Sequence, residues 1–165
     1  MRKYAVLSPR FWIGDTGKEL RKYGDVQRIA LYSLSCPDSN MIGLYYLSIP
    51  TLCHELNIKP QGASKGLLIL NNLQYAAYDT VSETVFVYEM VRFQVGESLK
   101  PTDKRVAGID KELQQYVKSP FYNLFIRKYK DRFNLSSEEI PENEKGLARG
   151  IIQEQEQEQA QIQDQ

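Results

Sequence analysis

Four polar side chains recur along residues 60–74 at a spacing that would place them on one side of a helix. They are Gln61, Ser64, Lys65 and Asn72. Amide, hydroxyl and ammonium groups can hydrogen-bond to base edges when a helix lies in the major groove of DNA. Gly62 would let a phosphate approach the backbone N–H groups at the helix start. These residue types indicate a DNA-reading surface, although any solvated helix also carries polar residues.

Two features complicate this interpretation. Leu68 falls on the same side of the helix, where it could touch a thymine methyl group or mark a protein-binding surface. Asp79 and Glu83 flank the tip of a predicted hairpin, and no Lys or Arg lies between Gln74 and Met90. Because acids repel phosphate, this tip would be a poor clamp for DNA.

Charge is distributed unevenly along the chain. Residues 1–134 carry 19 basic and 13 acidic side chains, a net charge of +6, whereas residues 135–165 carry 2 and 8, a net charge of −6. A basic body with an acidic tail is typical of nucleic-acid-binding proteins, although the tail could simply be solubilising. Phosphate contacts need only charge and reach. We therefore add as candidate DNA contacts Arg2, Lys3, Lys100, Lys104 and Arg105. A further basic cluster, on the last predicted helix, comprises Arg127, Lys128, Lys130 and Arg132; it could equally be a solvated face.

The sequence gives little support for catalysis or for a bound metal. Cys36, Cys53 and His54 are too few for a tetrahedral zinc site, and no phosphate-binding glycine loop is present. We expect no enzyme activity, cofactor or metal. We also expect a cytoplasmic protein with no membrane association, because no signal peptide or long apolar run occurs.

The elements that would position these residues follow from periodicity. Helical spacing covers residues 25–35, a strand-like run covers 43–48, and a short helix begins near Pro50. After a turn at 57–60, the helix of residues 60–74 has an apolar face made of Ala63, Gly66, Leu67, Leu70 and Leu73. Strand-like runs at 75–80 and 84–89 then form a hairpin. This order predicts a mainly α fold with a small β-hairpin (α+β), namely a winged helix-turn-helix over residues 1–95.

Two amphipathic helices are predicted in residues 96–134. Thr102 could cap the first, and Ser119 and Pro120 start the second. Their apolar faces must pack on the first domain or on a second subunit, as in a homodimer, so the candidate partner contacts, together with Leu68, are Leu113, Phe121 and Phe125. Residues 135–165 have a polar, Gln/Glu-rich composition that predicts a disordered tail.

Several segments resemble a group of phage and prophage proteins. They are residues 7–18, 40–47, 62–67 and 96–101. The group consists of winged-helix DNA-replication proteins of the replisome-organiser and DnaD-like primosomal type, and the resemblance spans about residues 5–133. It implies a domain that binds duplex or forked DNA at an origin and recruits a helicase or helicase loader. It also implies DNA contacts by Ser64 and Lys65, whereas Gln74 stands where many winged helices have Gly.

Two alternatives remain open at this stage. A transcriptional regulator would use the same helix as a dimer on a palindromic site. A protein-interaction module that inhibits a host machine would suit the acidic hairpin tip and Leu68. A DNA-bound member of either DNA-binding class would lie at the nucleoid of a bacterial cell.

Overall fold

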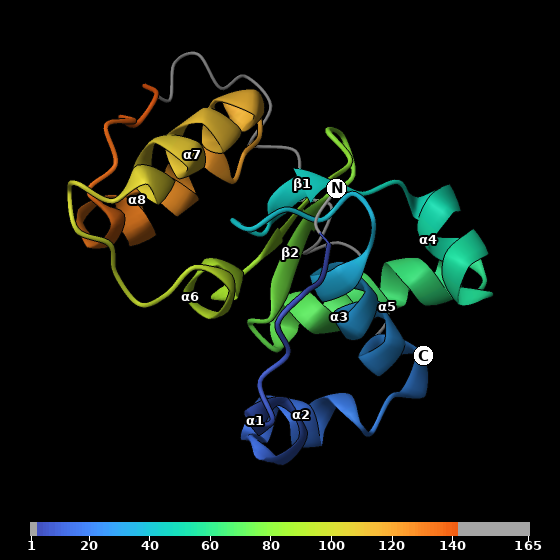
Figure 1. Ribbon diagram of the computed structural model, residues 1–165. Coiled ribbons are helices and arrows are strands. Elements are labelled where there is room, and N and C mark those ends of the chain that lie inside the picture. The colour runs from blue at the N-terminus through green and yellow to red at the C-terminus, as the bar shows by residue number, and fades with distance from the viewer. Residues whose placement is uncertain (1–2, 142–165) are drawn as a thin grey trace.

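The computed structural model describes residues 3–141. A three-stranded antiparallel sheet lies at its centre, and helices pack on both faces of the sheet (Figure 1). The strands are β1 (Leu44–Tyr46), β2 (Ala76–Asp79) and β3 (Thr84–Val87). The helices are α1 (Arg10–Ile13), α2 (Asp15–Leu20), α3 (Gly24–Ser35), α4 (Ile49–Leu56), α5 (Pro60–Asn72), α6 (Met90–Gln94), α7 (Lys104–Leu113), the 3₁₀ turn η1 (Gln114–Tyr116) and α8 (Tyr122–Phe133). The predicted class, mainly α with a small β element, is confirmed.

The sheet divides the interior into two cores. Its strand order is β1-β3-β2, and Phe86 of β3 stands opposite both Leu44 and Ala77. Leu44 and Phe86 face one core, whereas Tyr45 and Val85, the next residue pair of the register, face the other. Successive side chains of a strand point to opposite faces, so each short strand contributes to both cores.

The first core lies between the sheet and the helices α3, α4 and α5. The predicted apolar face of α5 is confirmed, because Ala63, Gly66, Leu67 and Leu70 are buried there. Gly66 allows close packing of α5 on α3, since a Cβ atom at this position would lie 2.4 Å from Cδ1 of Ile29. This packing turns the opposite, polar side of α5 outward.

The second core lies on the other face of the sheet, under α6, α7 and α8. Leu113 and Phe125 are completely buried in it, and Phe121 packs against it. The prediction of a partner contact is therefore wrong for Leu113 and Phe125, whereas Phe121 is partly exposed. They attach residues 96–134 to the sheet of the same chain instead. The predicted cap of α7 also needs correction, because Asp103, and not Thr102, accepts a hydrogen bond from the N–H of Arg105 (2.9 Å).

The first residues of the predicted tail belong to the folded body. Leu135 and Ser137 are buried, and Ile140 packs against the second core. The carboxylate of Asp110 on α7 accepts hydrogen bonds from the backbone N–H and hydroxyl groups of Ser136 and Ser137, over 2.6–3.0 Å. The prediction of disorder from residue 135 is therefore wrong for 135–141. The rest of the tail, residues 142–165, lies outside the described residues.

The N-terminal segment forms an arm and a corner below the sheet. Residues 3–9 run along the body to the α1–α2 corner (Figure 1). The side-chain amide of Gln94 holds this arm, since its Oε1 accepts from the N–H of Val6 (3.1 Å) and its Nε2 donates to the carbonyl of Val6 (2.9 Å). Within residues 3–141, no helix has the length and apolar character needed to cross a membrane.

Candidate nucleic-acid interface

The α4–α5 pair presents the predicted base-reading residues. Asn57 ends α4 in the left-handed conformation (φ 51°, ψ 51°), which an asparagine adopts more readily than most residues. Lys59 and Pro60 then start α5. The guanidinium of Arg28 on α3 donates to the carbonyl of Leu56 (2.9 Å) and so braces the turn from behind. The turn between the two helices is thus fixed by local backbone geometry and by a contact with α3.

The polar side of α5 is free to make contacts. Gln61, Ser64, Lys65 and Asn72 are all exposed. None of these four side chains hydrogen-bonds or forms an ion pair with another described residue. Leu68, between them, is half-buried and belongs to neither core. The structure therefore gathers the predicted residues on one surface, which we call the α5 surface (Gln61, Gly62, Ser64, Lys65, Leu68 and Asn72).

The start of α5 is open to an anion. No side chain caps it, so the first backbone N–H groups lack an intrahelical acceptor. A Cβ atom built on Gly62 would meet nothing within 4 Å, so a phosphate could come close to this backbone. Lys59 is exposed at the N-cap position and forms no ion pair with a described residue. Lys59 was not among the predicted DNA contacts, although its place directly before Pro60 marks it as a helix N-cap.

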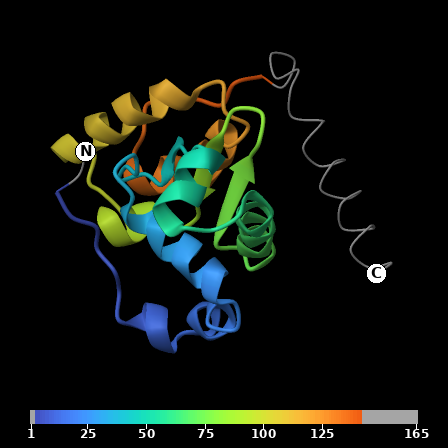
Figure 2. The same ribbon diagram turned by 90° about the vertical axis from the view of Figure 1, so that its right-hand side faces the viewer.

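The other candidate cations do not join the α5 surface. Lys100, Lys104 and Arg105 lie at the α6–α7 linker and the start of α7, across the sheet from α4 and α5 (Figures 1 and 2). Arg105 also has partners within the chain, because it pairs with Asp103 (2.7 Å) and its guanidinium donates a hydrogen bond to the carbonyl of Val95 (2.9 Å). Lys3 lies on the exposed N-terminal arm, and Arg2 lies outside the described residues.

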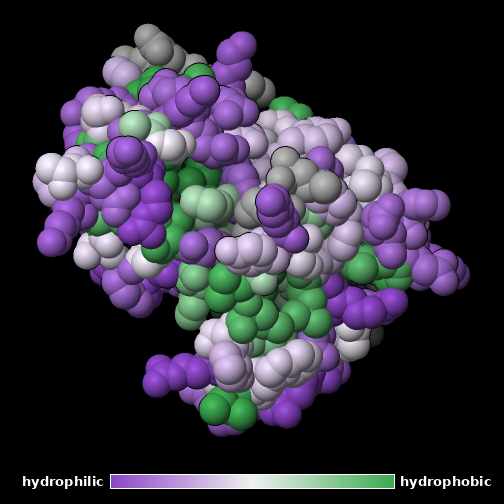
Figure 3. Space-filling view, viewed as in Figure 1, coloured by the Kyte–Doolittle hydropathy of each residue, from purple (hydrophilic) through white to green (hydrophobic). Residues whose placement is uncertain are grey.

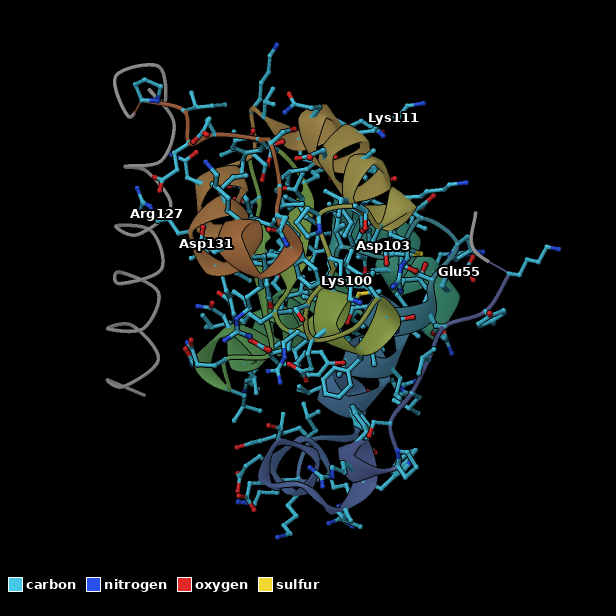
Figure 4. The ribbon with its side chains drawn as sticks, turned by 60° about the vertical axis from the view of Figure 1, so that its left-hand side comes forward. Glu55, Lys100, Asp103, Lys111, Arg127 and Asp131 are labelled. Atoms are coloured by element: carbon cyan, nitrogen blue, oxygen red, sulfur yellow. The ribbon has the colours of Figure 1, made fainter. Side chains whose placement is uncertain are left out.

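The basic cluster of α8 is largely neutralised within the chain. Arg127 pairs with Glu139 (2.8 Å), Lys130 pairs with Glu138, and Lys128 pairs with Glu89. Figure 4 shows Arg127 and Asp131 on this helix. Burial opposes the charge of Glu89, but hydrogen bonds from Lys128 and Arg92 outweigh it and lower the pKa of its carboxyl group. These acids neutralise basic side chains that would otherwise attract phosphate.

The hairpin tip is less acidic at its surface than the sequence suggests. Asp79 is buried and accepts hydrogen bonds from the backbone N–H groups of Val81 (3.3 Å) and Ser82 (3.0 Å). Glu83 accepts from the hydroxyl of Tyr46 (2.7 Å), and this bond raises the pKa of Tyr46. Asp79 therefore shapes the loop, and its carboxylate lies below the surface of the hairpin tip.

These contacts define what the α5 surface can do. It offers hydrogen-bond donors and acceptors, one lysine in its middle, a second lysine at its edge and an open helix N-terminus. Among the described residues, no group of three His, Cys, Asp or Glu side chains is placed to hold a metal ion. Comparison of the chain with protein-family models, curated proteins and solved structures gives no match.

Proposed function

We propose that the chain is a DNA-binding protein in which α3, α4 and α5 with the β2–β3 hairpin form a winged helix-turn-helix. In this arrangement α5 lies in the major groove of duplex DNA. One observation carries the proposal: the side chains of Gln61, Ser64, Lys65 and Asn72 share an exposed surface and have no partners among the described residues. Amides read adenine, and lysine reads guanine or a phosphate.

The open N-terminus of α5 adds to this proposal. Two features favour a negative group there, namely the helix dipole and the uncapped N–H groups near Gly62. A phosphate at this position would fix how deeply α5 enters the groove, because backbone contacts set register and base contacts set specificity.

We further propose a role in the initiation of phage-type DNA replication, with recruitment of a helicase or helicase loader. A resemblance of residues 62–67 and 96–101 to replisome-organiser proteins would imply this role. A transcriptional regulator remains the alternative within DNA binding. Inhibition of a host machine is favoured by one observation, the half-exposed Leu68 in the middle of the α5 surface.

Replacement of Lys65 tests the proposal directly. Lys65→Ala is expected to weaken binding to duplex DNA and, if Lys65 contacts a phosphate, to lower the slope of log affinity against log salt by about 0.9. Lys111→Ala is the matched control, because Lys111 is equally an exposed, unpaired lysine but lies on α7 (Figure 4). Fluorescence anisotropy over a salt series measures both. Equal affinities of the two variants for duplex DNA would show that α5 is not part of the DNA interface.

The form of DNA that binds best separates the remaining functions. Tighter binding to a forked duplex than to a linear one supports replication. A symmetric footprint with half-sites about one helical turn apart supports a regulator. If the chain binds no duplex even at low salt, while Leu68→Ser abolishes capture of a host protein, the chain is an interaction module.

A further inference from the structure

A cavity of about 250 Å³ opens between the α1–α2 corner and the body of the protein. Apolar residues gather there on the face shown in Figure 3. Four aromatic side chains line the cavity: Phe11, Tyr75, Tyr88 and Phe93. A closed cavity of about 150 Å³ already admits benzene. This cavity therefore has room for a larger planar ring system.

Three charged side chains line the cavity, namely those of Arg10, Asp15 and Glu89. Asp15 pairs with Lys18 (3.2 Å), and Glu89 pairs with Arg92 and with Lys128. Arg10 lines the cavity, and its guanidinium pairs with no described residue. The unpaired charge at the cavity is therefore positive, and the ligand that complements it is an anion that also carries flat apolar groups.

More aromatic surface continues outward from the cavity. Phe93, which lines the cavity, is 56% exposed, and Trp12, whose ring packs against Phe11, is 45% exposed. Large exposed rings cost hydration free energy and mark a binding surface when they cluster. Rings beside unpaired cations are the combination that binds single strands, because bases stack on the rings while the cations contact phosphates.

We infer that the cavity is a binding site for single-stranded DNA, with one base in the cavity and the adjoining phosphate at Arg10. Duplex DNA does not fit this site, because its bases are already stacked inside the helix. The largely apolar wall favours DNA over RNA, since the 2′-hydroxyl groups of RNA would lose water there without gaining partners.

This site is separate from the α5 surface. No residue of the α5 surface lines the cavity. The duplex-binding proposal and the single-strand proposal can therefore fail independently, and the variants that test one leave the residues of the other unchanged.

The only tryptophan in the chain, Trp12, reports on this site without a label. Its ring centroid lies 5.2 Å from that of Phe11, which lines the cavity. The full-length chain is titrated with an oligothymidylate of about 15 nucleotides, within the length that single-strand-binding folds cover. An abasic strand and an oligouridylate of the same length are titrated in parallel. We expect the oligothymidylate to change Trp12 emission and to bind more tightly than either of the other strands.

Two variants locate the contacts. Phe93→Ala removes an exposed ring and is expected to weaken single-strand binding about 5- to 150-fold, the effect of losing one stacked base. Arg10→Gln is expected to lower the log–log salt slope by about 0.7, the effect of one phosphate of a single strand. Leu124→Ala and Arg132→Gln are the matched controls, because both residues are exposed on α8. Circular dichroism and duplex affinity should stay unchanged in all four variants.

Three results would overturn the inference. Equal affinity for the abasic strand would show that the site attracts charge only. Tighter binding of oligouridylate would assign the site to RNA. A peptide of residues 142–165 that displaces the oligothymidylate and changes Trp12 emission more strongly would assign the site to the acidic end of the chain.

Discussion

Gly17 lets α1 and α2 meet more closely than any other residue would permit. A Cβ atom at this position would lie 1.7 Å from the carbonyl oxygen of Phe11. Because the obstacle is backbone, it cannot turn away as a flexible side chain would. The α1–α2 corner, and with it the position of Trp12, therefore depends on the absence of a side chain at one residue.

Gly17→Ala is expected to lower the free energy of unfolding by about 1–3 kcal/mol, the usual cost of overpacking. It should also shift Trp12 emission, since the corner has to open. Gly108→Ala is the control: its Cβ would meet nothing within 4 Å, and α7 should gain about 0.5–1 kcal/mol from the better helix former. Thermal unfolding with fluorescence detection measures both variants. A Gly17→Ala chain as stable as the wild type would contradict the clash.

Helical periodicity is enough to predict which side chains of α5 point outward. Ser64 and Lys65 are exposed as the spacing requires, because α5 packs against α3, α4 and β2 and so has one side left for solvent. Ion pairing is not predictable in the same way. The partner of Lys128 is Glu89, in a distant segment, and the acid that shapes the hairpin loop, Asp79, is buried by residues that fold over it.

At the scale of elements, α7 holds residues 135–141 through one carboxylate. Asp110 accepts four hydrogen bonds from Ser136 and Ser137. Asn123 of α8 adds two more, from its Nδ2 to the carbonyl of Ile140 (2.8 Å) and from the N–H of Ile140 to its Oδ1 (3.0 Å). The segment is polar in composition, yet side chains on two helices bind it in a defined conformation.

Asp110→Asn tests this attachment and its dependence on pH. Burial raises the pKa of Asp110, but the hydrogen bonds from the two serines outweigh it and lower the pKa overall. Asp110 therefore stabilises the fold above the unfolded pKa of about 3.9 and loses that contribution as the pH falls through the lower, folded pKa. We expect Asp110→Asn to cost about 1–2 kcal/mol near pH 7 and almost nothing in strong acid.

The control for this prediction is Asp131→Asn, because Asp131 is an exposed carboxylate on α8 that forms no ion pair with a described residue (Figure 4). Unfolding curves at several pH values compare the two variants with the wild type. A stability difference for Asp110→Asn that persists unchanged in strong acid would show that its carboxylate charge is not responsible.

The elements that sequence periodicity fails to predict are short or depend on distant residues. Helix α6 has five residues, too few to show a helical period. The order of residues 135–141 depends on Asp110, which a local pattern of serines and glutamates cannot reveal. The longer elements α3, α5 and α8 are predicted because each carries a full apolar face that must be buried.

At the scale of the whole molecule, the two cores share one sheet. Phe86, on the central strand β3, contacts the rings of Phe121 and Phe125, at centroid distances of 6.2 and 5.9 Å. Its neighbour Val85 packs into the first core. Loss of either core therefore removes support from the same strands, so we expect residues 3–141 to unfold in one cooperative step.

Leu113→Ala tests this coupling. Leu113 is completely buried in the second core, so the substitution should lower stability by about 2–5 kcal/mol. The loss should not depend on protein concentration, because the contacts of Leu113 lie within one chain. Leu124→Ala, at a residue that is 40% exposed, should change stability by less than about 0.5 kcal/mol. Two separate unfolding transitions, or a concentration-dependent midpoint, would contradict a shared sheet.

The side-chain amide of Gln94 hydrogen-bonds to the N–H and the carbonyl of Val6, so this attachment does not depend on the Val6 side chain. This pair of hydrogen bonds can form with almost any residue at position 6, apart from a proline, which would remove the N–H. The sequence of the arm can therefore change without loosening its attachment. Side chains along residues 3–9 can differ between related sequences without a change of fold, provided that Gln94 is kept.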